Sequence, residues 1–201
     1  MSRTSPKMVG ITGGIGAGKT LISSIFSLLS IPVYNADDRA KWLMINNLPL
    51  KMKISKAFGN SAYFGDGSLN RQFLAEIVFY DPKKTAVING LVHPAVAEDF
   101  IAWANGQQTS FVLKEAALLF ETGSYKNLDF TIHVTAPEAL RIKRVSSRDP
   151  QRGTDQIRHI IAQQFTDKMK NKLADFKVTN DESVLVIPQV LKIYEKLMEH
   201  E

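Results

Sequence analysis

Residues 8–20 read MVGITGGIGAGKT, the most informative stretch of the chain. The run from Met8 to Thr12 is apolar, which is typical of a buried parallel strand. The segment from Gly13 to Thr20 then fits G-x-x-x-x-G-K-[ST], and apolar residues recur at helical spacing from Leu21 to Leu29. A strand, a glycine loop and a helix in this order indicate a phosphate-binding loop, because backbone N–H groups and a helix N-terminus together attract anions.

This loop predicts a nucleotide ligand and its metal ion. The glycines let the backbone fold around phosphate groups, because side chains there would block the approach. Lys19 is expected to reach the β and γ phosphates of ATP, and the Thr20 hydroxyl is expected to coordinate Mg²⁺. The residues predicted to bind ATP are Gly13, Gly14, Ile15, Gly16, Ala17, Gly18, Lys19, Thr20 and Leu21. Kinases, GTPases and motor proteins all use such a loop, so other segments must decide among them.

The composition predicts a soluble, cytoplasmic protein. The chain has 201 residues, of which 44% are hydrophobic, so it can bury a full core in one compact unit with room for an inserted subdomain. Cysteine is absent, which excludes a disulfide framework and a thiolate metal site. The N-terminal residues lack the apolar run of a signal peptide, and no uninterrupted apolar stretch is long enough to span a membrane, so no membrane contact is predicted.

Positive charge is concentrated in residues 141–172. The net charge of the chain is +5, and this segment carries nine lysines and arginines against three aspartates. Such a segment suits a polyphosphate ligand, whereas a single-strand nucleic-acid binder would also need interleaved aromatic side chains, and the segment has only Phe165. The sequence therefore predicts no nucleic-acid partner. Nucleic-acid binding and a solvated helix face are the alternative interpretations.

Strands and helices are expected to alternate along the chain. Further strands are predicted from apolar, β-branched and aromatic content at residues 31–35, 111–115, 130–135 and 176–179. Helices are predicted between and after these strands, at residues 137–148, 153–172 and 187–198. This order predicts an α/β fold of the P-loop NTPase type, with a parallel sheet flanked by helices and ligands at the carboxyl ends of the strands.

A helical insertion is expected to interrupt this alternation after the second strand. Its helices are predicted at residues 38–45, 50–58, 70–79 and 82–104. Pro94 is expected to kink or divide the last helix, because proline removes a hydrogen bond and clashes with the preceding turn. Three parts are thus predicted: a nucleotide-binding core at 1–37, 106–140 and 173–201, a helical acceptor-binding subdomain at 38–105, and an Arg-rich lid at 141–172.

Short strings spread through the chain are more specific than the loop alone. They are Gly10 to Thr20, Asn35-Ala36-Asp37, Gly67-Ser68-Leu69-Asn70-Arg71, His93-Pro94-Ala95-Val96, Leu118-Leu119-Phe120-Glu121, Arg144, Arg148-Asp149, Ala174-Asp175 and Asn180. In this order they strongly resemble the dephospho-CoA kinases over nearly the whole chain, with departures from the family pattern at Asn35, Ala117 and Ile160. The resemblance implies transfer of the γ-phosphate of ATP to the ribose 3′-hydroxyl of dephospho-CoA, the last step of coenzyme A biosynthesis.

The predicted catalytic residues are Asp37, Lys19, Arg144 and Arg148. Asp37 matches the aspartate that the family retains, and it would act as a base or an orienting group for the attacking hydroxyl, or else cap the helix that follows. Arg144 and Arg148 are four residues apart, so they share one helix face and can both reach phosphate groups.

The metal site is predicted to contain Thr20 and Glu115. Glu115 stands at the end of a predicted strand, where it would bind Mg²⁺ through a water molecule. The alternative is a buried carboxylate whose hydrogen-bonding needs are satisfied by Lys19 or Thr20.

The acceptor dephospho-CoA is the predicted partner, and the residues predicted to bind it are Arg71, Phe79, His93, Leu118 and Glu121. Arg71 would hold the diphosphate of the acceptor or pair with a neighbouring carboxylate. His93 could instead make a structural hydrogen bond, and Phe79 and Leu118 could belong to an apolar core. These roles follow from the resemblance and not from the residue pattern.

Two other functions share most of these features. One is a P-loop kinase that acts on a nucleoside or a small metabolite, and the other is a regulatory nucleotide-binding protein that hydrolyses its nucleotide slowly. Strict dependence of ADP formation on dephospho-CoA would favour the kinase of coenzyme A synthesis over both.

Overall fold

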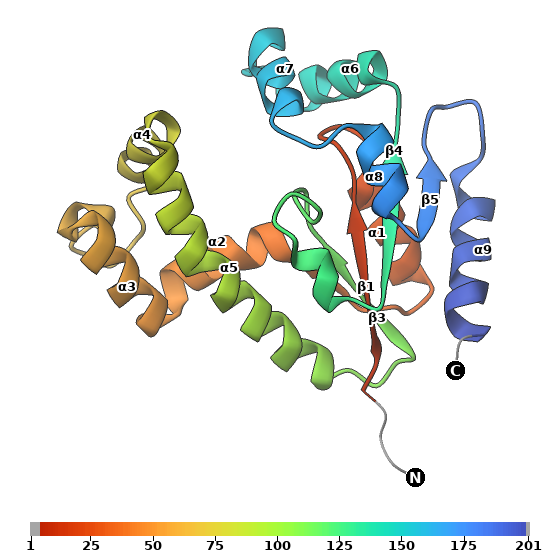
Figure 1. The fold of residues 1–201 in the computed structure, drawn as a ribbon, viewed down its shortest axis with the longest axis horizontal. Helices are drawn as coiled ribbons and strands as arrows, with labels where there is room; N and C mark the ends of the chain where they lie inside the picture. The colour runs from red at the N-terminus through yellow and green to blue at the C-terminus, as the bar shows by residue number, and fades with distance from the viewer. Residues whose placement is uncertain (1–4, 200–201) are drawn as a thin grey trace. The chain divides into compact units, whose positions relative to one another are not determined.

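The structure is a computed structural model that describes residues 5–199 (Figure 1). The chain divides into two compact units, one formed by residues 36–103 and the other by the segments before and after them. Among the described residues, no helix is both long and apolar enough to cross a membrane.

The first unit is built on a five-stranded parallel sheet with the order β2-β3-β1-β4-β5. Its strands are β1 (Lys7–Thr12), β2 (Val33–Asn35), β3 (Phe111–Glu115), β4 (Phe130–Thr135) and β5 (Phe176–Thr179). All five lie where the sequence predicts strands, although β2 begins at Val33 rather than at Ile31. The parallel sheet confirms the predicted α/β fold of the P-loop NTPase type.

The two faces of this sheet are covered by different helices, because side chains alternate along each strand. The helices of the unit are α1 (Lys19–Leu28), α6 (Glu138–Arg148), α7 (Thr154–Ala162), α8 (Asp167–Leu173), α9 (Val186–Glu199) and the short 3-10 helix η2 (Ser124–Asn127). Ile132 and Val134 of β4 belong to an apolar core that also includes side chains of α1 and α9. His133, between them, points to the opposite face, where its Nδ1 lies 2.8 Å from Oδ1 of Asn171 in α8.

Residues 153–172 form two helices, α7 and α8, and the prediction of one continuous helix is wrong. The linker 163–166 leaves the helical ladder where the backbone N–H of Phe165 donates a 2.8 Å hydrogen bond to the carboxylate of Glu121. Thr166 then begins a new helix, because its hydroxyl caps the first turn of α8. The division thus combines a local capping residue, Thr166, with a contact between distant segments, and no local pattern encodes the latter.

The second unit is helical. It contains α2 (Ala36–Asn46), α3 (Leu48–Phe58), η1 (Asn60–Ala62), α4 (Arg71–Tyr80) and most of α5 (Pro82–Asn105). The side chains of Asn47 and Asn70 cap α3 and α4, since each accepts a hydrogen bond from a backbone N–H of the first turn. Arg39 of α2 donates two hydrogen bonds, of 2.7 and 2.8 Å, to Asp99 of α5, and this bidentate pair ties the two helices together.

Helix α5 runs without a break through Pro94, so of the kink or division predicted at this proline, the division did not occur. Val92, Val96 and Phe100 are buried and follow one another at spacings of four residues on one face of the helix. Burial of this apolar face on both sides of Pro94 offsets the hydrogen bond that the proline cannot make.

Candidate active site

The phosphate loop, residues 13–18, connects the end of β1 to the start of α1. Gly16 and Gly18 have φ angles of +77° and +96°, a conformation that L side chains rarely adopt. A Cβ atom at Gly13 would collide with the backbone carbonyl of Val134 in β4. Glycine is therefore required both for the turn of the loop and for its close approach to the neighbouring strand.

A hollow of about 170 Å³ opens beside this loop. It is lined by Gly16, Gly18, Lys19, Thr20, Arg144, Val145 and Arg148. Three cationic side chains, Lys19, Arg144 and Arg148, thus surround the N-terminus of α1, which adds the positive end of its own dipole. This concentration of positive charge suits a polyphosphate ligand.

The two arginines of α6 are held differently. Arg144 donates a 3.0 Å hydrogen bond to the backbone carbonyl of Asn180, just after β5, and also pairs with Glu182 at 3.2 Å. Arg148 donates hydrogen bonds of 3.1 and 3.0 Å to Asp149, and these bonds raise the pKa of Arg148. Arg144 is therefore held by residues that follow β5, whereas Arg148 is exposed and bonds only to the adjacent residue, Asp149, among the partners described.

Thr20 and Glu115 lie side by side at the carboxyl end of the sheet. The Thr20 hydroxyl donates a 3.1 Å hydrogen bond to Oε1 of Glu115, which is 7% exposed at the end of β3. Lys19 donates from its Nζ to the carbonyl oxygen of Gly13 at 3.1 Å. The structure thus places Thr20, one of the two partners proposed for Glu115 from the sequence, against its carboxylate.

The donor set fits a magnesium ion that is held mainly by its nucleotide. In the part of the chain that the structure describes, no three carboxylates or imidazoles gather as a metal-binding group. Mg²⁺ in kinase sites usually keeps several waters and takes only one or two protein ligands beside phosphate oxygens. One hydroxyl and one carboxylate, Thr20 and Glu115, match this requirement.

Three residues outside the predicted set support the phosphate loop. Gln164 accepts a 2.9 Å hydrogen bond from the backbone N–H of Ile15, and Asn180 donates a buried 2.8 Å bond to the carbonyl of Ala17. Arg141, 8% exposed, packs so closely against Gly14 that a Cβ there would collide with its guanidinium. Asn180 belongs to the family strings and Arg141 to the basic segment, but no sequence signal pointed from Gln164 to the loop.

Glu121, predicted to bind the acceptor, contacts the base of the predicted lid. Its Oε1 accepts the hydrogen bond from the N–H of Phe165 at 2.8 Å and lies 3.0 Å from the ammonium nitrogen of Lys170. The Lys170 side chain is completely buried, although it stands in a basic run that looks like a solvated surface. Leu118, in the same turn after β3, is exposed.

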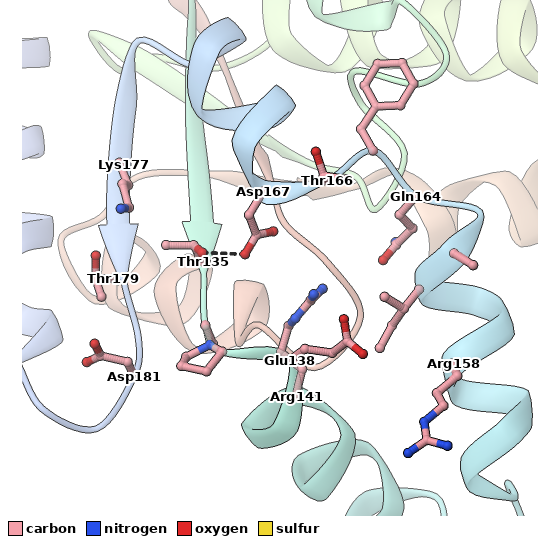
Figure 2. A pocket seen from close by; sticks show the side chains of 15 residues that line it. Thr135, Glu138, Arg141, Arg158, Gln164, Thr166, Asp167, Lys177, Thr179 and Asp181 are labelled. Atoms are coloured by element: carbon pink, nitrogen blue, oxygen red, sulfur yellow. Dashed lines mark hydrogen bonds between the residues drawn. The ribbon is translucent and has the colours of Figure 1, made fainter.

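A larger cavity, of about 690 Å³, lies between the carboxyl ends of β4 and β5 and helices α6, α7 and α8 (Figure 2). Figure 2 shows Arg141, Gln164 and Asp167 converging on it from three different segments. The Thr135 hydroxyl donates a 2.6 Å bond to Asp167. Burial would raise the pKa of Asp167, but the His133 imidazole, whose Nε2 lies 3.6 Å away, the hydrogen bond from Thr135 and the charge of Arg141 outweigh burial and lower the pKa to about 2.

The second unit contains the remaining predicted residues. Asp37 is exposed in the first turn of α2, which begins at Ala36, so Asp37 does not cap a helix that starts after it. Arg71 and His93 are exposed on α4 and α5. Phe79 lies in α4, and its side chain is outside the described part of the chain.

A glycine loop between β1 and α1, arginines of α6 beside it and a parallel sheet with β1 between β3 and β4 define a nucleotide-binding protein of the P-loop class. The sequence profile of the dephospho-CoA kinase family matches residues 7–185. The chain therefore belongs to the dephospho-CoA kinase family. Membership makes it a transferase of coenzyme A biosynthesis that phosphorylates dephospho-CoA with ATP.

Individual relatives agree with this assignment. The chain is 34% identical over 187 residues to the dephospho-CoA kinase of Porphyromonas gingivalis, covering 93% of this chain and 92% of the relative. It is 39% identical over 176 residues to that of Salinibacter ruber, covering 86% and 88%. Its fold is similar to the crystal structure of TT1252 from Thermus thermophilus, with a TM-score of 0.85, 28% identity and coverage of 96% and 98%.

Proposed function

We propose that the chain transfers the γ-phosphate of ATP to the ribose 3′-hydroxyl of dephospho-CoA, with the nucleotide in the hollow beside the phosphate loop. The observation that carries the proposal is the meeting of Lys19, Thr20, Arg144 and Arg148 around that hollow. The loop N–H groups and the N-terminus of α1 would hold the phosphates, and Lys19 would stabilise the negative charge of the transferred group.

Magnesium fits the Thr20 and Glu115 pair. Thr20 would bind the ion directly, and Glu115, which accepts a 3.1 Å hydrogen bond from the Thr20 hydroxyl, would bind it through a water molecule. The ion would neutralise charge on the β and γ phosphates. Glu115 also orients the Thr20 hydroxyl. Because this hydroxyl donates its hydrogen to Glu115, the lone pairs of the Thr20 oxygen stay available for a cation.

Asp37 is proposed as the base on the acceptor side. It follows Asn35 by two residues, and Asn35 is the register partner of Glu115 at the carboxyl end of the sheet. In the proposed reaction the 3′-oxygen bonds to the γ-phosphorus, its proton passes to the Asp37 carboxylate, and the bond from the γ-phosphorus to the β–γ bridging oxygen breaks to release ADP.

Acceptor binding is assigned to residues 38–105, with Arg71, Phe79 and His93 as contacts, and to Leu118 and Glu121 after β3. Dephospho-CoA carries a diphosphate and a long flexible arm, and an insertion of this length supplies the surface to bury both. Residues 141–172 are proposed to close over the nucleotide as a lid. We expect the enzyme to act in the cytoplasm with small molecules as its partners.

The test is ADP release measured with ATP and a panel of acceptors: dephospho-CoA, AMP, adenosine and none. The proposal expects ADP release to depend on dephospho-CoA and to be far slower with the truncated acceptors, because remote binding energy orients the 3′-hydroxyl. Comparable turnover with AMP would contradict it in favour of a nucleotide kinase. Unchanged ADP release without any acceptor would contradict it in favour of a regulatory hydrolase.

A further inference from the structure

The linker between α7 and α8 touches the phosphate loop from outside the nucleotide hollow. The amide oxygen of Gln164 accepts a 2.9 Å hydrogen bond from the backbone N–H of Ile15, across 149 residues of sequence. Gln164 lines the larger cavity shown in Figure 2, whereas the residues that line the hollow include neither Gln164 nor Ile15. The contact therefore lies outside the hollow in which the phosphates are proposed to bind.

The position of Gln164 is itself fixed by the next residues of the chain. The N–H of Phe165 donates to Glu121 at 2.8 Å, and the same carboxylate oxygen lies 3.0 Å from the ammonium of Lys170. Lys170 is fully buried, and 11% of the Glu121 side chain is exposed, so the ion pair is shielded from water and salt. Glu121, paired with Lys170, thus holds the linker at Phe165.

We propose that Gln164 is a positioning residue for nucleotide binding, and that the Glu121–Lys170 pair acts through it. Through its hydrogen bond to Ile15, the Gln164 side chain holds the phosphate loop in the conformation that binds phosphates. Removal of this side chain therefore weakens nucleotide binding without altering the acceptor site. The inference rests on the proposed placement of ATP in the loop. It gives Glu121 support of the linker as a role beside the proposed acceptor contact.

The loop retains other supports when Gln164 is changed, so the expected effect is graded. Arg141 still packs against Gly14, and Asn180 still donates to the carbonyl of Ala17. Ile15 is only partly buried, so water can replace the lost acceptor. A single hydrogen bond of this kind changes an equilibrium constant by about three- to tenfold.

Gln163 offers a matched control. It is the adjacent residue of the same type, but its side chain is exposed and its Nε2 lies 3.0 Å from Nε2 of His159, away from the loop. Gln163→Ala therefore removes an identical group from the same linker without touching Ile15.

The first experiment measures ADP dissociation constants by titration calorimetry for the full chain and for Gln164→Ala, Gln164→Asn and Gln163→Ala. Gln164→Ala and the shorter Gln164→Asn should weaken ADP binding about three- to tenfold and raise the KM for ATP in parallel, with the KM for dephospho-CoA unchanged. Gln163→Ala should stay within twofold of the parent. Gln164→Ala within twofold of the parent, or an equal loss in Gln163→Ala, would overturn the inference.

The second experiment tests whether Glu121 acts through Gln164. Glu121→Gln keeps an acceptor for the N–H of Phe165 but removes the charge that faces Lys170. It should weaken ADP binding in the parent and have no further effect in the Gln164→Ala background, since both changes release the same contact. Additive losses would overturn the coupling. ADP binding needs no acceptor, so failure here is separate from failure of the parent to phosphorylate dephospho-CoA.

Discussion

Replacement of Lys170 by Met tests how the base of the predicted lid is built. Lys170 is completely buried, and the carboxylate of Glu121, 3.0 Å away, is also largely shielded from solvent. Removal of one partner from a buried ion pair typically costs about 3–5 kcal/mol, because the other charge is left without compensation. Glu121 keeps its hydrogen bond from Phe165, so the lower figure of about 3 kcal/mol is expected here.

For a chain of this size, each kcal/mol lowers Tm by about 2–4 °C, so Lys170→Met should lower Tm by about 6–12 °C. Thermal unfolding followed by circular dichroism measures this directly. Lys168→Met is the control, because Lys168 is exposed on the same helix and its loss should change stability by less than about 0.5 kcal/mol.

The double variant Lys170→Met with Glu121→Gln separates two costs: the loss of the attraction between Lys170 and Glu121, and the burial of an unpaired Glu121 carboxylate. It should recover at least half of the loss in Tm, because the neutral amide leaves no buried, unpaired charge. A Tm within 2 °C of the parent for Lys170→Met, or a drop of the same size for Lys168→Met, would refute the burial argument.

Three further outcomes are expected. Lys19→Ala should leave Tm unchanged and lower kcat by more than about tenfold, or about 1.4 kcal/mol, and a smaller loss in steady-state assays would refute its role in charge stabilisation. Asp37→Asn should lower kcat far more than it weakens ATP binding by calorimetry, whereas a loss of ATP affinity with normal kcat would place Asp37 at the nucleotide. Asp167 has a folded-state pKa of about 2 against 3.8 when unfolded, so it contributes about 2 kcal/mol above pH 4 that is lost as the pH falls towards 2. Urea unfolding at a series of pH values should therefore show a shallower acid decline for Asp167→Asn, and an unchanged decline would refute this contribution.

The parts of the fold that depend on residues close together in the sequence were predictable from it. The strand, loop and helix around Gly13 to Thr20 follow from local apolar patterns and glycine placement. The spacing of Arg144 and Arg148 puts both on one face of α6, and both line the hollow. Fold class follows from the alternation of such local elements.

Contacts between distant segments were not predictable in this way. Gln164 reaches Ile15 across 149 residues, and nothing in its neighbourhood distinguishes it from the exposed Gln163. Lys170 looks like one of several surface cations until the fold brings Glu121 beside it. The division of the predicted helix at residues 153–172 has the same cause, because Phe165 finds its hydrogen-bond partner in another segment.

Identification of the reaction product tests the central claim most directly. The protein is incubated with ATP, Mg²⁺ and dephospho-CoA, and both products are quantified by chromatography with mass spectrometry. The proposed reaction gives ADP and a product identical to coenzyme A, with the new phosphate on the ribose 3′-oxygen, in equal amounts. ADP that accumulates without coenzyme A, or a phosphate placed elsewhere on the acceptor, would contradict the account.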